Sequence, residues 1–327
     1  MLRLQPPSLM QHAICDVDVL EPHARRPMST GYSAVFNGEH SFSASFSSFR
    51  NGSANGIATG IPPPPRSFPP AAPAASPARV AATSVVVTTL QQLVAAFADT
   101  SVADIVLANN IQMRGSELAL TGPGRSLSLR AAPGACAPYL SASGRNVSGG
   151  RWCTLDAAGA SRLFTISGGA ALHLEALALV GGSALQGGCV LAAGDTSSVT
   201  ASDCLFADCT ALGDGGAALA LAGARITLLA GSSAVNCTAQ HADGGALAAL
   251  HGSTVALLDT ASVAGCHAQN GGGVAAIHNS SVVLAGGAAV SNCTAEGQAG
   301  GVAAAFYSTA TLQRASIQVG RDPLPFK

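Results

Sequence analysis

The chain has 327 residues, a formal net charge of −1, 10% charged residues and 4% aromatic residues. It carries no block of basic or acidic residues, so neither nucleic acid nor an anionic membrane is indicated as a partner. Large aromatic side chains normally contribute much of a globular core. Their scarcity, beside abundant Gly, Ala, Ser and Val, favours a narrow and repetitive core.

Residues 1–84 are expected to form a disordered arm and linker. The Pro/Ala/Ser-rich stretch 61–79 is typical of an extended linker that cannot build a core. The first 30 residues contain prolines and acidic residues where a signal peptide needs an unbroken apolar stretch. No segment reaches the roughly 18 apolar residues of a transmembrane helix. Either export uses no ordinary signal or the true start lies elsewhere.

The ordered part of the chain is expected to begin near Val85. Residues 89–98 predict a short amphipathic helix behind a threonine cap, because their large apolar residues share a helical spacing. These residues are Leu90, Leu93, Val94 and Phe97. The runs 104–113 and 126–132 alternate apolar and polar residues between turn signals, which predicts strands.

The second half of the chain repeats itself. The second glycine of a glycine pair recurs at spacings of 28, 29, 28 and 28 residues: Gly188, Gly216, Gly245, Gly273 and Gly301. A cysteine precedes each of the last four by seven or eight residues: Cys209, Cys237, Cys266 and Cys293. A branched residue lies ten or eleven before each cysteine: Val199, Ile226, Val255 and Val282. Three marks that keep one period indicate a solenoid.

The type of solenoid follows from pairs of apolar residues. The two members of each pair are two positions apart, and the pairs recur at one place in each repeat: Ile226/Leu228, Val255/Leu257, Val282/Leu284 and Ala310/Leu312. This is the period of a strand. A glycine pair in every repeat opposes helical repeats, and the leucine-rich frame is absent. We therefore predict an all-β parallel β-helix over residues 85–327. Its coils of about 28 residues would stack about 4.8 Å apart, with the helix at 89–98 covering the first coil. The open last coil suggests a longer parent chain or an unusual end.

Three stretches resemble the repeats of chlamydial polymorphic outer-membrane proteins: 205–221, 263–277 and 290–306. The motifs of that family pair Phe-x-x-Asn with Gly-Gly-Ala-Ile. Here the phenylalanine is kept only as Phe206, and cysteine stands in place of the asparagine. More broadly, residues 85–320 resemble right-handed β-helix proteins of the pectin-lyase-like class, including large surface proteins of green algae. The resemblance implies a right-handed β-helix with an adhesive role at a cell surface.

Asp214 and Asp243 are the candidate catalytic residues. Both lie two residues before a marked glycine, so stacking would bring them together at a turn. Paired carboxylates can serve general acid/base catalysis or bind Ca²⁺. Aspartate before two glycines is also ordinary turn chemistry, with each aspartate capping its own turn, and we favour this interpretation. The next two coils would carry Gly271 and Ala299 there, so no acidic groove is expected to follow.

His251 and His278 are the candidate metal ligands. Each lies four residues before its valine mark, so the two should be neighbours. A Zn²⁺ site needs further ligands, but the adjacent coils offer Ala222 and Phe306 at this position. We favour the interpretation that both histidines are turn residues, followed by Gly252 or Asn279 in a left-handed conformation.

The four marked cysteines are candidates for a disulfide ladder between adjacent coils, because the coil spacing lies within the range of disulfide Cα distances. Buried thiols that fill an inward stack are the alternative. Cys136 and Cys153 are placed to close a loop. Candidate glycosylation sequons begin at Asn51, Asn146, Asn236, Asn279 and Asn292.

The sequence as a whole favours a non-catalytic extracellular or cell-surface protein with an adhesive or structural role. Carbohydrate or surface proteins are its expected partners, and no cofactor is implied. The alternative is a divergent carbohydrate-active enzyme of the pectin-lyase-like fold, either a polysaccharide lyase or a glycoside hydrolase, that uses Asp214 and Asp243. Against the alternative, polygalacturonase-like motifs are missing and Trp152 is the sole tryptophan available to stack on sugars.

Overall fold

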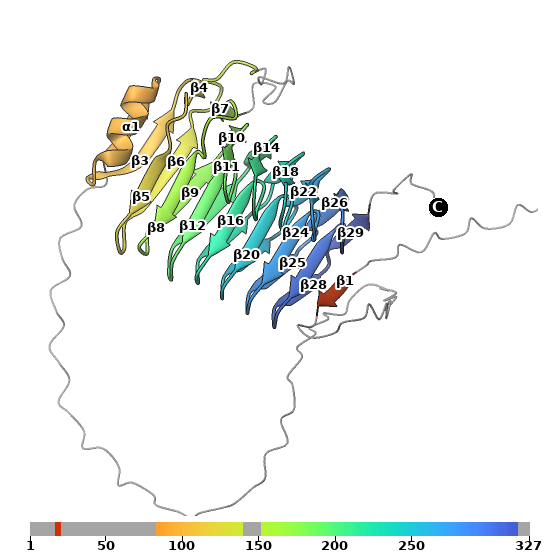
Figure 1. Ribbon diagram of the computed structural model, residues 1–327. Coiled ribbons are helices and arrows are strands. Elements are labelled where there is room, and N and C mark those ends of the chain that lie inside the picture. Colours follow the sequence, from red (N-terminus) through yellow and green to blue (C-terminus); the bar gives the residue numbers. More distant parts are fainter. Residues whose placement is uncertain (1–16, 21–82, 140–151, 320–327) are drawn as a thin grey trace, which may run out of the picture.

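The computed structural model describes residues 17–20, 83–139 and 152–319. Within them the chain forms a right-handed parallel β-helix of about eight coils, each of ~27 residues, as the sequence predicts (Figure 1). The arm predicted over residues 1–84 lies outside the described residues, apart from the strand β1 and the start of β2. The boundary at residue 84 therefore stays a prediction.

Three sheets, all with parallel ladders, form the sides of the described solenoid. Sheet A contains β1 (Val17–Leu20), β5 (Leu118–Thr121), β8 (Phe164–Ser167), β12 (Val190–Ala193), β16 (Ala218–Leu221), β20 (Leu247–Leu250), β24 (Val274–Ile277) and β27 (Val302–Ala305). Sheet B contains β2 (Thr83–Val87), β3 (Val102–Leu107), β6 (Ser126–Ala131), β9 (Ala171–Glu175), β13 (Ser198–Ser202), β17 (Arg225–Leu228), β21 (Thr254–Leu257), β25 (Ser281–Ala285) and β28 (Thr309–Gln313).

Sheet C is built from a row of side strands and a row of very short corner strands. The side strands are β4 (Ile111–Gln112), β7 (Cys153–Asp156), β10 (Leu177–Val180), β14 (Leu205–Ala207), β18 (Ser233–Val235), β22 (Ser262–Ala264), β26 (Ala289–Ala295) and β29 (Ser316–Val319). The corner strands are β11 (Ser183–Ala184), β15 (Thr210–Ala211), β19 (Thr238–Ala239) and β23 (His267–Ala268). In this sheet β26 spans both rows, pairing with β22 and with β23.

The helix α1 (Leu90–Ala98) covers the first coil, as predicted (Figure 1). The Thr89 side chain accepts a hydrogen bond from the Gln92 amide, while the Gln92 side chain accepts from the Thr89 amide, which completes a capping box. The buried face of α1 contains Leu93, Ala96 and Phe97, and the ring of Phe97 stacks on that of Phe164 at 5.7 Å between centroids. Val94 differs from the prediction, because it points outward and is 42% exposed.

The inward positions of the strands form one continuous core. Val199, Ile226, Val255 and Val282 are successive partners in sheet B, and each is at most 1% exposed. The predicted strand pairs therefore occupy equivalent positions on successive coils. Sheet A fills its share of the core largely with alanine, for example Ala220, Ala249 and Ala276. This is the narrow core that the composition indicates.

The glycine register is corrected in the last two coils. Leu247 pairs with Val274, and Val274 pairs with Val302, so the glycines that precede them by two are equivalent. The true ladder is therefore Gly188, Gly216, Gly245, Gly272 and Gly300. The prediction placed Gly273 and Gly301 there, because a run of three glycines at 271–273 hides a coil that is one residue shorter. A Cβ atom on Gly188, Gly216 or Gly245 would collide with the carbonyl oxygen of the next glycine in this ladder.

Alanine at Gly245 should therefore destabilise the fold strongly. Its Cβ would meet backbone atoms of the next coil at Gly272 and His267, and a backbone cannot move aside as a flexible side chain can. We expect a loss of about 3 kcal/mol in the free energy of unfolding, measured by urea denaturation. The matched control is Gly252→Ala, which meets open space but has a φ of +78°. Its cost should be about 1 kcal/mol. An equal or smaller loss for Gly245→Ala would contradict the close contact between coils.

Candidate functional site

Asp214 and Asp243 lie together, as the sequence predicts, in the turns that precede β16 and β20. One carboxylate oxygen of Asp214, Oδ1, accepts a hydrogen bond from the backbone amide of Asp243 at 3.2 Å. The Asp243 Oδ1 in turn accepts from the side-chain amide of Asn270 at 2.8 Å. Asn270 Oδ1 then accepts from the backbone amide of Gln298 at 3.0 Å. Gln186 donates to Asp214 Oδ2 at 3.4 Å.

These contacts define a polar ladder of five residues along one edge of the solenoid: Gln186, Asp214, Asp243, Asn270 and Gln298. The sequence predicts that each aspartate caps its own turn, whereas each side chain bonds to a neighbouring coil. The predicted register also places Gly271 and Ala299 on the next coils, where the structure has Asn270 and Gln298. The signal that was missed is the pairing of Leu247 with Val274, which sets the register across the three glycines.

The environment of Asp243 shifts its protonation. Burial raises the pKa of this carboxyl above its ordinary value, and the nearby charge of Asp214 adds to the increase. The hydrogen bonds with Asn270 oppose this shift. A raised carboxyl pKa is the property that a general acid needs. However, the Asp243 carboxylate accepts a hydrogen bond from Asn270, and the Asp214 carboxylate accepts one from the backbone amide of Asp243. These are the contacts of structural caps.

His251 and His278 also lie together at a turn, between sheets A and B. Their rings stack with 5.0 Å between centroids and 1° between planes. Phe306 continues the stack at 4.7 Å from His278. The lone pairs of imidazole nitrogens lie in the plane of the ring, so parallel rings do not direct their nitrogens toward one point between them. All three residues have φ between +53° and +57°, which supports the turn interpretation.

The four marked cysteines form a column at equivalent places on consecutive coils, directly before β15, β19, β23 and within β26. Each is at most 1% exposed. Cys209 is joined by a disulfide to Cys189, which sequence reasoning did not single out, while Cys237, Cys266 and Cys293 are free thiols. Cys136 and Cys153 form a disulfide, which confirms the predicted loop closure.

Burial and hydrogen bonding together raise the pKa of three of the free thiols, Cys204, Cys266 and Cys293. Burial raises the pKa of Cys204 to about 12. The pKa values of Cys266 and Cys293 are also raised, first by hydrogen bonding to the neighbouring thiol of the column and then by burial. Since the thiolate is the nucleophilic form, these side chains are held in the unreactive state near neutral pH. The column therefore packs as part of the core.

The sequons differ in their surroundings. Asn279 is exposed in the bend between β24 and β25, and Asn292 is exposed within β26 at its register shift, with φ of 58° and 53°. Asn236 has the same left-handed backbone, but it is half-buried, and its side-chain oxygen lies next to Gly265 of the following coil. Asn51 and Asn146 lie outside the described residues.

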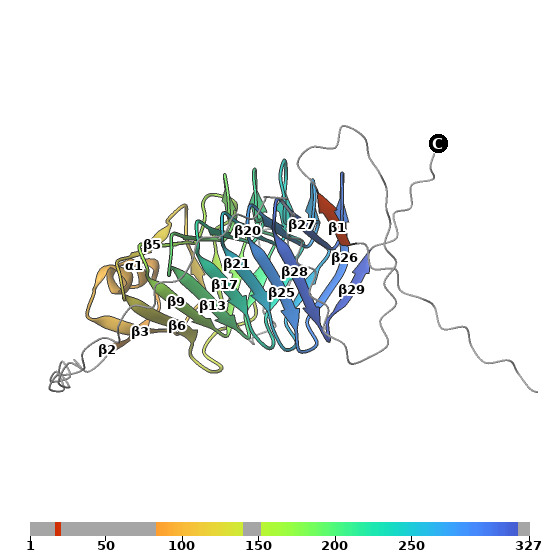
Figure 2. The ribbon, with the colours of Figure 1, turned by 90° about the horizontal axis from the view of Figure 1, so that it is seen from below.

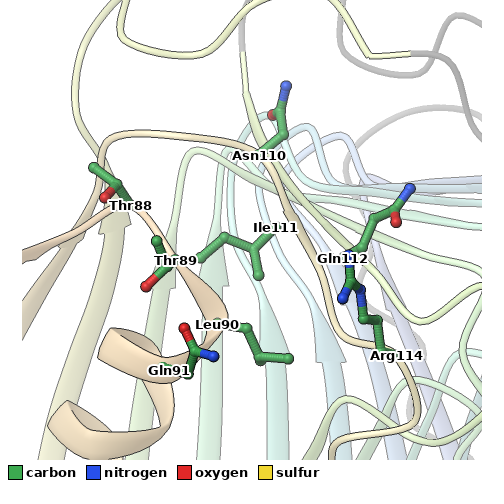
Figure 3. Close-up of a pocket in the computed structure, with 8 residues that line it drawn as sticks. All are labelled: Thr88, Thr89, Leu90, Gln91, Asn110, Ile111, Gln112 and Arg114. Carbon is green, nitrogen blue, oxygen red and sulfur yellow. The ribbon is translucent and has the colours of Figure 1, made fainter.

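A shallow groove lies where α1 meets β4 (Figure 3). Leu90 and Ile111 form its apolar part, and its polar lining is Thr88, Thr89, Gln91, Asn110, Gln112 and Arg114. Backbone amides at the start of α1 already have hydrogen-bond acceptors within the chain. The Thr88 amide donates to Gln92 Oε1 at 2.8 Å, and the Gln92 amide donates to Thr89 Oγ1 at 3.3 Å. The groove is therefore interpreted as the seam between the cap and the first coil.

In 17–20, 83–139 and 152–319, His, Cys, Asp and Glu side chains do not gather in groups of three or more that could hold a metal ion. The same ranges contain no helix with the length and apolar character needed to cross a lipid bilayer.

Residues 84–210 match the family model of the "Putative pectate lyase-like adhesive domain". This adhesive-domain match runs from β2 to the start of β15, and similar coils continue beyond it to β28. It supports the pectin-lyase-like resemblance, whereas the chlamydial and green-algal resemblances stay predictions. Comparisons with curated proteins and with solved structures gave no significant match.

The variant Asp243→Asn should stabilise the protein in a pH-dependent way. Because burial raises the pKa of Asp243 in the folded state, its contribution to stability is greatest below the unfolded pKa and falls as pH rises through the folded pKa. Asparagine keeps the oxygen that accepts from Asn270 and removes the charge. We expect a gain of at most about 1 kcal/mol at pH 7 that disappears toward pH 4, measured by urea unfolding.

The contrasting variant is Asn270→Asp, which places a second carboxylate where Asp243 now meets an amide donor. This variant should lose stability at pH 7 and recover part of it at pH 4. A stability difference between wild type and Asp243→Asn that does not change with pH would contradict the polar ladder.

Proposed function

We propose that the chain is a non-catalytic adhesive or structural module that acts outside the cell or at its surface. The observation that carries the proposal is the adhesive-domain match over residues 84–210. The repetition beyond it supports the same conclusion, because coils that repeat one set of residues extend a surface and do not build a single reaction centre. Residues 85–327 would be one β-helix domain, and residues 1–84 the arm that links it to other structures.

Two further features support an oxidising, extracellular setting. The disulfides Cys136–Cys153 and Cys189–Cys209 are of the kind that persists in secreted and surface proteins. The exposed sequons at Asn279 and Asn292 can accept glycans without disturbing the core. We propose these two as glycan sites. Asn236 is the weaker candidate, because its side chain lies against Gly265.

The competing function is a divergent polysaccharide lyase or glycoside hydrolase that uses Asp214 and Asp243. Their separation of one coil is compatible with carboxylate pairs in glycosidases. However, the Asp214 carboxylate bonds to the Asp243 backbone, and the Asp243 carboxylate bonds to Asn270. Both are thereby occupied in joining coils.

Adhesion and turnover can be measured on the same protein. Beads coated with the full chain should be retained under flow on surfaces coated with polysaccharide or with cell-surface glycoprotein, and beads coated with the unfolded chain should not. The soluble chain should release no unsaturated or reducing sugar from polygalacturonate or alginate. Sugar release that Asp243→Ala abolishes would establish the enzyme instead. Retention equal to that of the unfolded control on every surface would refute the adhesive function.

A further inference from the structure

The solenoid has three outer faces, one for each sheet. The outer face of sheet A is covered by turns of the same chain. Leu219 and Ala248 point outward there, yet both are 0% exposed. The glycine turns fold over them: a Cβ on Gly215 would lie 3.1 Å from Leu219, and a Cβ on Gly244 would lie 3.0 Å from Ala248. Sheet A is therefore closed to a flat partner along these coils.

Sheet C is divided along its length. Its first coils carry an outer apolar cluster of Ala178, Val180, Leu205 and Ala207, on which Trp152 packs. Further along, its side strands shorten to three residues, and β26 has a register shift between Ser291 and Cys293. The outer side of sheet C is thus neither uniform in chemistry nor regular in backbone.

Sheet B is different, because its strands lie side by side in unbroken register from β13 to β28 (Figure 2). Two outward rows cross these five strands. The first row is Ser198, Arg225, Thr254, Ser281 and Thr309, and the second is Thr200, Thr227, Ala256, Val283 and Thr311. We call these two rows the hydroxyl face, since seven of the ten residues carry a hydroxyl group.

The hydroxyl face is nearly free of charge. Of its ten residues only Arg225 is ionised. The other charged residues of sheet B lie nearer the cap: Asp104 and Arg130 form an ion pair of 3.1 Å, and Glu175 lies on β9, beside the first strand of the face. Within the face, Thr254 Oγ1 and Ser281 Oγ lie 3.1 Å apart, so these hydroxyls reach one another across the coils. A hydroxyl group both donates and accepts hydrogen bonds, as the hydroxyl groups of sugars do.

We propose that the hydroxyl face binds the surface of a neutral polysaccharide. This inference rests on the proposed adhesive function and names its partner class. With Arg225 as the one charged side chain among ten, the face offers little to attract an acidic polysaccharide or a charged membrane. The ten residues of the face include no aromatic side chain, so the face offers neither the aromatic anchors of protein interfaces nor stacking on sugar rings. Hydrogen bonds between hydroxyl groups are the contacts that it does offer. Hydroxyl groups that recur about every 4.8 Å along each row can instead make many weak, equivalent hydrogen bonds to aligned polymer chains.

The mode of binding has two consequences. Single contacts are weak, so free mono- and disaccharides should not compete, while the insoluble polymer should bind through many contacts at once. Charge contributes little, so binding should change little between low and high salt, in contrast to an ionic interaction. Both consequences can be measured by sedimentation of the full chain with insoluble cellulose or xylan.

The decisive variants are matched pairs of Thr→Val substitutions, which remove hydroxyls at nearly constant shape. Thr200→Val with Thr227→Val removes two neighbouring hydroxyls of the face. Thr210→Val with Thr238→Val, in the corner strands β15 and β19 of sheet C, removes the same number elsewhere and serves as the control. We expect the first pair to weaken the apparent Kd for cellulose or xylan about tenfold, and the control pair to bind like wild type. Equal unfolding midpoints would show that both variants are folded.

The inference is overturned if both pairs bind like wild type, if both lose binding equally, or if polygalacturonate gel is bound more tightly in a salt-sensitive way. It is also overturned if the chain binds protein-coated beads but no neutral polysaccharide, and in that case the adhesive function itself survives. Failure to bind any tested surface would instead refute the adhesive function.

Discussion

The hydrogen bond between equivalent backbone groups of neighbouring coils is the constraint on which the rest of this structure depends. The amide of Gly216 donates to the carbonyl of Gly244 at 3.1 Å, and the amide of Gly245 donates to that of Gly271 at 3.2 Å. Such bonds hold each coil at one strand spacing from the next. Residues at the same place in each coil are therefore forced into contact, and wherever two backbones touch directly only glycine has room.

This constraint also explains why the residues that carry chemical groups serve the architecture. A carboxylate or amide at a repeated turn meets the amide of the next coil, and the polar ladder through Asp214 and Asp243 results. Histidines at a repeated turn stack on each other, and inward cysteines fill a column of the core. In each case the side chain contacts a residue one coil away. The aspartate and histidine clusters that resemble catalytic or metal sites in the sequence are therefore contacts between repeats.

The sequence predicts the parts of the fold that rest on periodicity. The capped helix α1 and the strand pairs such as Ile226 and Leu228 were predicted because apolar spacing reports burial directly. The turn register was predicted less well, because three consecutive glycines at 271–273 carry no side-chain pattern that separates one alignment from the next. That one-residue shift concealed Asn270 and Gln298 as members of the polar ladder. The Cys189–Cys209 disulfide was missed because Cys189 lies outside the repeated marks, and only the three-dimensional stack brings it beside Cys209.

The candidate surfaces were still harder to predict, since they depend on which turns fold over which sheet. Outward polar residues are visible in the sequence for sheet B, whereas the central strands of sheet A are apolar on both faces. Only the structure shows that glycine turns cover Leu219 and Ala248 and leave Thr200 and Thr227 partly exposed. The adhesive-domain match and the hydroxyl face of sheet B then favour the same kind of function.

Amide hydrogen exchange of the turn glycines tests the central claim most directly. Gly215, Gly244 and Gly271 donate to carbonyls of the next coil at Asp243, Asn270 and Gln298, each at 3.0 Å. If stacked coils determine the register, these three turn amides exchange as slowly as the core strands β17 and β21. Exchange at the rate of open loops would show that the turns are not bonded to their neighbours, and would contradict the account.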